Sequence, residues 1–188
     1  MPLEFIQANI QHGKAQSAFL CKRIIECQIK IALIQEPWVY HGKDSVEPTI
    51  CPSPKLEIQI PSRDDWDNTN NTICQNGIIW FTDGSKIGDK AGAGAEIYAI
   101  LACGMEILKT APKRRTIQIC TDSQAALMAI ESSKVKSRLV LDCKKILNDL
   151  ASCNRVILTW VPGHSGVPGN EEADRLARLG SIGYPHRT

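Results

Sequence analysis

Hydrophobic and polar positions follow two different periodicities near the N-terminus. "LEFIQANI" alternates like a strand, "AQSAFLCKRIIECQIK" carries apolar residues at helical spacing, and "IALIQEPW" is a short apolar run stopped by proline. This order predicts a β-α-β fragment in residues 1–43. The following interval, 44–76, is rich in Pro, Asp and Asn, with only "KLEIQI" as a strand candidate, and we interpret it as a linker.

From Gly77 onward the periodicity returns and predicts alternating strands and helices. The expected strands are "GIIWFT", "TIQICT" and "RVILTWV". The expected helices are "AEIYAILACGMEILK", "SQAALMAIESS" with a serine cap, "KSRLVLDCKKILNDLAS" and "NEEADRLARLGS". This alternation favours a layered α/β domain with a mainly parallel sheet, which we place at residues 77–184.

Composition agrees with a globular protein and gives little sign of its partner. The chain has 188 residues, of which 43% are hydrophobic and 22% charged, and its formal net charge is +2. That charge is too small to predict nucleic-acid binding, so any contact with a polyanion must come from local clusters such as "KRR" at Lys113 to Arg115.

The cysteines and the N-terminus favour an intracellular protein, nuclear or cytoplasmic, rather than a secreted one. The eight cysteines are scattered without a C-x-x-C pair, as is typical of reduced thiols. "MPLEFIQANIQHGK" does not have the pattern of a signal peptide, and no apolar run approaches the length of a membrane span. We therefore expect no membrane association.

Two aspartates follow predicted strands at equivalent places. Asp83 comes just after "GIIWFT" and Asp122 just after "TIQICT". In a parallel sheet, the edge formed by the carboxyl ends of the strands is where sites form. Two carboxylates side by side at that edge repel each other and need a cation between them. Taken singly, an aspartate at the end of a strand is typical of a turn or a helix cap.

Two further acids lie near the starts of predicted helices. Glu96 falls in the first turn of the helix after Asp83, and Asp174 falls in the first turns of the last helix. Four hard oxygen donors aimed at one edge suit Mg²⁺ or Mn²⁺, and a pair of such ions can promote hydrolysis of a phosphodiester. Taken alone, Glu96 would complement the helix dipole, and "NEEAD" would be a capping stretch.

The order and spacing of four motifs resemble the ribonuclease H domain of non-LTR retrotransposon polyproteins. These motifs are "FTDGS", "AEIYAI", "CTDSQAAL" and "WVPGHSGVPGNEEAD", and the resemblance covers about Gly77 to Ser181. It implies a ribonuclease H-like three-layer fold with a mixed sheet. It also implies a metal-dependent endonuclease that uses two Mg²⁺ or Mn²⁺ ions to hydrolyse the RNA strand of RNA/DNA hybrids.

The same resemblance implies roles for individual residues. The catalytic, metal-binding carboxylates would be Asp83, Glu96, Asp122 and Asp174. His164, in the glycine-flanked loop "PGHSGVPG", would assist proton transfer or product release. The contacts with nucleic acid would come from Gly84, Ser85, Gln124 and Asn170. Asn170 could also cap the last helix or position the histidine loop.

Family members recognise hybrids through 2′-hydroxyls and the backbone rather than base edges, so the resemblance implies cleavage with little sequence preference. The basic cluster from Lys113 to Arg115 would add a salt-sensitive attraction for phosphates.

The N-terminal fragment resembles the first two motifs of the endonuclease/exonuclease/phosphatase-type endonuclease domain of the same elements. "FIQANIQHGKAQSAF" and "IALIQEPW" carry this resemblance, which implies a phosphate contact for Asn9 and a metal ligand for Glu36. The later motifs of that domain do not follow, and no reverse-transcriptase stretch intervenes. We interpret the chain as an internally deleted retrotransposon polyprotein in which Glu36 lacks its partners.

The connection between Asp83 and Glu96 is shorter than the family pattern implies. Ribonuclease H domains carry an antiparallel strand pair there, whereas "DGSKIGDKAGAG" joins "AEIYAIL" directly. We expect the second and third strands to be missing, which would leave "GIIWFT" open to another strand of this chain or of a second molecule.

Two functions therefore stay open at the level of sequence. One is an active ribonuclease H; the other is a degenerate, catalytically inactive domain that binds nucleic acid or a protein partner weakly. The oligomeric state is not predicted.

Overall fold

The computed structural model describes residues 5–9, 31–35, 45–51, 55–68, 73–74, 77–83, 93–110 and 112–182. Its main sheet has the strand order β4-β8-β6-β5, with strands Glu57–Gln59, Arg155–Trp160, Thr116–Thr121 and Ile78–Thr82. Every pairing within this sheet is parallel, which confirms the mainly parallel sheet that the alternation predicts. Among the described strands, the main sheet contains no antiparallel pair of the kind that a mixed sheet requires. The described helices are α2 (Arg63–Asn68), α3 (Ala93–Thr110), α4 (Gln124–Glu131), α5 (Arg138–Ala151) and α6 (Pro168–Ile182).

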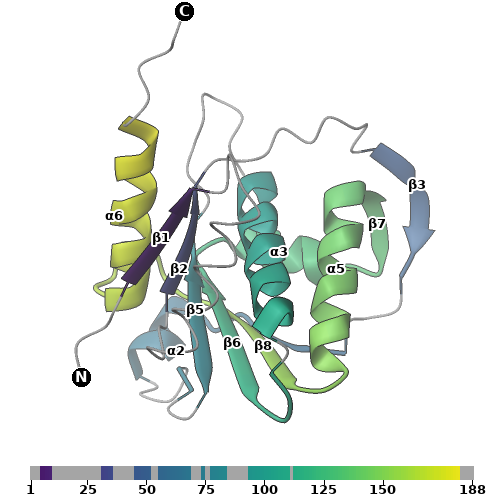
Figure 1. The fold of residues 1–188 in the computed structure, drawn as a ribbon, viewed down its shortest axis with the longest axis horizontal. Helices are drawn as coiled ribbons and strands as arrows, with labels where there is room; N and C mark the ends of the chain where they lie inside the picture. The colour runs from purple at the N-terminus through teal and green to yellow at the C-terminus, as the bar shows by residue number, and fades with distance from the viewer. Residues whose placement is uncertain are drawn as a thin grey trace, which may run out of the picture.

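Helices cover both faces of the main sheet, so the fold has three layers (Figure 1). On one face, α3, α4 and α5 bury an apolar cluster that includes Trp80 of β5. On the other face, α6 packs against Ile79 and Phe81 of the same strand. Successive side chains of β5 thus enter opposite layers, as strand geometry requires. The predicted layered α/β fold is confirmed.

The close approach of α6 to β5 depends on a glycine in the first turn of the helix. A Cβ atom at Gly169 would lie 2.3 Å from Cε2 of Phe81, far inside contact distance. Glycine lets the helix backbone rest on the aromatic ring, and this contact fixes the height of α6 above the sheet.

The helix starts differ in part from those that the sequence predicts. Ser123 caps α4 as expected, since its hydroxyl accepts a hydrogen bond from the Ala126 amide at 3.2 Å. The next helix was expected from Lys136, but Lys134–Ser137 forms strand β7, and Ser137 caps α5.

The interval interpreted as a linker contributes strands to the fold. β4, inside the candidate "KLEIQI", pairs with β8 at the edge of the main sheet. β3 (Ser45–Ile50), which the sequence does not predict, pairs with β7 in an antiparallel arrangement. The side chain of Gln118 in β6 accepts a hydrogen bond from the Cys74 amide at 2.7 Å. Parts of this interval therefore pack along the sheet.

Strands β1 (Phe5–Asn9) and β2 (Ile31–Gln35) form a separate parallel pair, as the β-α-β prediction requires. The predicted helix between them lies outside the described residues. β2 lies beside β5 and contacts α6 (Figure 1). The pair thus adjoins the side of β5 that the shortened connection was expected to leave open, although residues 84–92 of that connection are outside the described residues.

None of the described helices combines the length and apolar character that a membrane crossing needs.

Candidate active site

Asp83 and Asp122 leave the main sheet at the same edge. β5 and β6 are parallel and in register, with Thr82 opposite Thr121, so the residue after each strand is an aspartate at its carboxyl end. The backbone of Asp122 is held by Trp160, whose Nε1 donates a hydrogen bond to the Asp122 carbonyl at 3.0 Å. The sequence predicted this juxtaposition of the two aspartates.

Glu96 joins the two aspartates from the first turn of α3. Glu96 is only 7% exposed, and its Oε2 accepts a hydrogen bond from the Thr121 hydroxyl at 3.0 Å. Carboxylate oxygens of Asp83, Glu96 and Asp122 all lie within 4.8 Å of one another. We call these three residues the carboxylate triad.

The spacing of the carboxylate triad is close to what one small cation requires. Magnesium–oxygen distances are about 2.0–2.1 Å, so two oxygens on opposite sides of one ion lie roughly 4.2 Å apart. Small side-chain rotations would bring separations of up to 4.8 Å into that range. Oxygen ligands of this kind suit a hard divalent ion rather than a soft one.

Asp174 lies beside the carboxylate triad but is not one of the three. Its Oδ2 is 3.7 Å from Nδ1 of His164. Burial raises the pKa of Asp122, repulsion from Asp174 raises it further, and attraction to His164 opposes the change. Negative charge is therefore concentrated at this edge of the sheet, where a bound cation would offset it.

The loop that carries His164 comes very close to Asp122. A Cβ atom at Gly163 would lie 2.9 Å from Oδ2 of Asp122, so a larger residue there would displace the carboxylate. His164 and Gly166 both have left-handed backbones, with φ of 53° and 76°. The His164 side chain is 70% exposed. An accessible imidazole therefore stands at the rim of the site, next to Asp174.

The residues predicted to contact nucleic acid lie in different environments. Gly84 and Ser85 lie outside the described residues. Gln124 is exposed at the first position of α4. Asn170 is only 3% exposed, and its Oδ1 has no hydrogen-bond partner in the described part of the chain. The suggestion that Asn170 caps the last helix is wrong, because α6 begins earlier, at Pro168, a residue suited to the first helical position.

Three residues that the sequence did not single out shape this site. They are Thr121, which binds Glu96; Trp160, which holds the Asp122 backbone; and Gly163, which leaves room for the Asp122 carboxylate. Thr121 stands directly before Asp122 in "CTDS", but its contact with Glu96 joins residues that are distant in the chain. Local sequence patterns carry no signal for such a contact.

A comparison with protein-family models shows which family this part of the chain is similar to. Residues 95–182 match the family model of RNase H. The matched segment runs from the start of α3 to the end of α6, and it contains Glu96, Asp122, His164 and Asp174. The three layers around a parallel sheet are consistent with the ribonuclease H-like fold. The match and the fold together support an RNase H domain in this part of the chain.

Proposed function

We propose that this chain is a ribonuclease H, a metal-dependent endonuclease that hydrolyses the RNA strand of RNA/DNA hybrids. The convergence of Asp83, Glu96 and Asp122 within 4.8 Å carries the proposal. This cluster lies at the carboxyl edge of a parallel sheet whose strands β6 and β8, with helices α4 to α6, fall in the segment matched to RNase H. A nuclease from this family acts on nucleic acid, so an RNA/DNA hybrid is the proposed partner.

The donor set fits divalent ions, and we assign its members accordingly. Asp83, Glu96 and Asp122 would hold Mg²⁺ or Mn²⁺, and Asp174, next to Asp122, would complete the site for a second ion. When bound there, such ions would generate a nucleophilic water at neutral pH and offset the charge of the phosphate.

The neighbouring residues hold this machinery in place. Thr121 orients Glu96, and Trp160 fixes the backbone from which Asp122 projects. Groups that orient ligands in this way typically affect metal affinity by about 10–100-fold. His164 stands exposed at the rim with its Nδ1 near Asp174, where it could take up or release a proton as the product leaves.

A cleavage assay with labelled substrates tests the proposal. Hybrid, single-stranded RNA and double-stranded DNA are each incubated with the full chain and Mg²⁺ or Mn²⁺. We expect cleavage of the RNA in the hybrid only, and its loss in Asp122→Asn. A matched control is Asp142→Asn, which removes a carboxylate paired with Arg138 on α5 and should leave cleavage unchanged. A folded parent chain that cleaves no hybrid with either metal would contradict the proposal.

The short connection after Asp83 supports the second candidate, an inactive domain that binds nucleic acid or a protein partner weakly. Only residues 84–92 lie between Asp83 and the start of α3 at Ala93, and so short a segment leaves little room for a pair of strands. Binding of the hybrid without cleavage, under the same conditions, would favour this candidate.

The retrotransposon origin is also proposed from the motif resemblance alone. Asn9 ends β1, while Glu36 lies outside the described residues.

The free thiols at Cys51, Cys74, Cys103, Cys120, Cys143 and Cys153 support the proposed intracellular location.

A further inference from the structure

A hollow of about 560 Å³ opens at the end of the main sheet opposite the carboxylate triad. It lies between the loop before β6, the end of α5 and the start of β8, and its lining residues are Lys113, Arg114, Arg115, Thr116, Ala151, Ser152, Cys153, Asn154 and Arg155. Because β6 has 6 residues, roughly 20 Å separates its two ends. A group in this hollow therefore cannot touch the triad.

The hollow is rich in positive charge. Its cations are the exposed side chains of Lys113, Arg114, Arg115 and Arg155, and no carboxylate is among its lining residues. Arg155 is paired with Glu57, whose Oε2 is 2.7 Å from Nη2 of the arginine. In the described part of the chain, the other three cations form no ion pair with a carboxylate.

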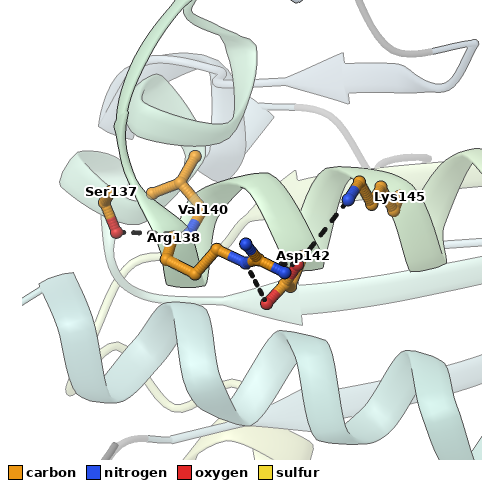
Figure 2. A network of polar contacts seen from close by, with 5 residues as sticks. All are labelled: Ser137, Arg138, Val140, Asp142 and Lys145. Atoms are coloured by element: carbon orange, nitrogen blue, oxygen red, sulfur yellow. Dashed lines mark hydrogen bonds and ion pairs between the residues drawn. The ribbon is translucent and has the colours of Figure 1, made fainter. Parts of the chain in front are cut away.

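Some cations elsewhere in the described part of the chain are compensated by carboxylates, whereas Lys134 and Lys136 on β7 form no ion pair there. Figure 2 shows Arg138 and Lys145 on α5 both reaching toward Asp142, with nitrogen–oxygen distances of 3.1 and 3.9 Å. The three cations from Lys113 to Arg115 differ from this network on α5, in which opposite charges are interspersed, because they are consecutive and line one hollow that contains no carboxylate.

The backbone around the hollow is held by hydrogen bonds rather than by its charged side chains. The amide of Arg114 donates to the Cys153 carbonyl at 2.8 Å, and the amide of Arg155 donates to the Arg115 carbonyl at 2.9 Å. Asn154 accepts from the Arg115 amide at 3.1 Å and donates to the Leu150 carbonyl at the end of α5 at 3.0 Å. The guanidinium groups are thus not required to close the loop or to cap the helix.

We propose that this basic hollow binds the phosphodiester backbone of a nucleic-acid strand at a second site, separate from the carboxylate triad. Guanidinium groups pair with phosphate oxygens through two parallel hydrogen bonds, and the ammonium of Lys113 adds a point charge. The lining contains no aromatic side chain on which bases could stack, so contacts with phosphates should dominate and binding should depend little on sequence. The site would hold a strand that extends beyond the hybrid at the triad.

Binding at the hollow needs neither metal nor cleavage, so it can be tested apart from the proposed function. The probe is a fluorescein-labelled single-stranded DNA 20-mer, and its anisotropy is measured against full-length protein in EDTA at several salt concentrations. The test variant is Lys113→Gln/Arg114→Asn/Arg115→Gln. Asparagine is chosen at 114 because φ is 56° there and asparagine tolerates that backbone. The matched control, Arg63→Gln/Lys134→Gln/Lys136→Gln, removes three exposed cations elsewhere.

We expect the test variant to bind at least about tenfold more weakly than the parent, and the control to bind within about twofold of it. On a single strand, each phosphate contact contributes roughly 0.7 to the magnitude of the slope of log K against log salt. Loss of three contacts should therefore lower that magnitude by about 2. If circular dichroism shows that the triple variant is unfolded, Lys113→Gln alone should lower the slope by about 0.7.

Three results would overturn the proposal. They are equal weakening by the test and control variants, no binding by the parent in EDTA, and full displacement of the 20-mer by inorganic phosphate at matched ionic strength. The last result would identify a site for a small free anion instead of a nucleic-acid strand.

Discussion

Replacing Thr121 with valine keeps the shape of the side chain and removes the hydroxyl that holds Glu96. Thr121 is fully buried, and its Oγ1 donates to Oε2 of Glu96 at 3.0 Å. The same oxygen accepts a longer hydrogen bond from the Ser123 amide at 3.3 Å. Valine can make neither bond, so a buried carboxylate loses a donor and an amide loses an acceptor.

The expected cost follows from the charge of the acceptor. Hydrogen bonds to charged groups contribute about 1.5–3 kcal/mol, against about 0.5–1.5 kcal/mol for neutral ones. We therefore expect Thr121→Val to lower the free energy of unfolding by about 2 kcal/mol, which for a chain of this size lowers Tm by about 4–8 °C. Because Glu96 also loses its fixed orientation, affinity for Mn²⁺ should fall by about 10–100-fold.

Thr82 provides a matched control on the neighbouring strand. It is opposite Thr121 in the sheet, is buried, and donates from its Oγ1 to the Cys120 carbonyl, a neutral acceptor, at 3.3 Å. Thr82→Val should cost about 1 kcal/mol and leave metal affinity unchanged. Thermal unfolding by circular dichroism, with and without Mn²⁺, measures both effects. Equal loss of stability in the two variants, with unchanged response to Mn²⁺, would refute the role given to Thr121.

The remaining predictions concern packing and the N-terminal segment. Gly169→Ala should destabilise the fold by about 1–3 kcal/mol, because its Cβ would lie 2.3 Å from Phe81. Gly94→Ala, whose Cβ would meet nothing within 4 Å, should be neutral or stabilising by up to about 1 kcal/mol. Denaturant unfolding measures the free energy of unfolding of both variants. Removal of residues 1–43, which takes β2 away from β5, should expose that side of the sheet and promote self-association, and light scattering that shows a stable monomer would contradict this. Glu36→Ala should leave any nuclease activity unchanged, so plasmid nicking that disappears with this substitution would show that the N-terminal fragment is active.

The sequence predicted the elements whose signals are local. β5, β6 and β8 are short apolar runs, and the aspartates that follow β5 and β6 mark their carboxyl ends. Ser123 was recognised as a cap because the signal and its consequence lie within one turn. Each aspartate directly follows its strand, and the carboxyl ends of parallel strands lie at one edge of a sheet. Both aspartates could therefore be placed at that edge before the fold was known.

Features that depend on distant contacts could not be predicted in this way. β3 is a mostly exposed strand with a proline, and it exists through its pairing with β7, far along the chain. The close approach of Gly163 to Asp122 likewise depends on how β8 and β6 lie in the sheet. The basic residues from Lys113 to Arg115 were expected to attract phosphates, which stays a prediction. The sequence did not give their place relative to the carboxylate triad, and they lie at the opposite end of β6 because they precede the strand that Asp122 follows.

The most direct test of the carboxylate triad is the change in Tm on titration with Mn²⁺ or Mg²⁺ for the parent, Asp83→Asn, Asp122→Asn and the control Asp142→Asn. A ligand at 100 times its Kd stabilises the folded state by about 2.7 kcal/mol. We expect a rise in Tm that corresponds to a stabilisation of this order in the parent and in Asp142→Asn only. Without metal, Asp122→Asn should be at least as stable as the parent, because burial and repulsion from Asp174 raise the pKa of Asp122 and disfavour its charged form. A parent chain that gains no stability from either metal, or triad variants that gain as much as the parent, would contradict a metal site at Asp83, Glu96 and Asp122.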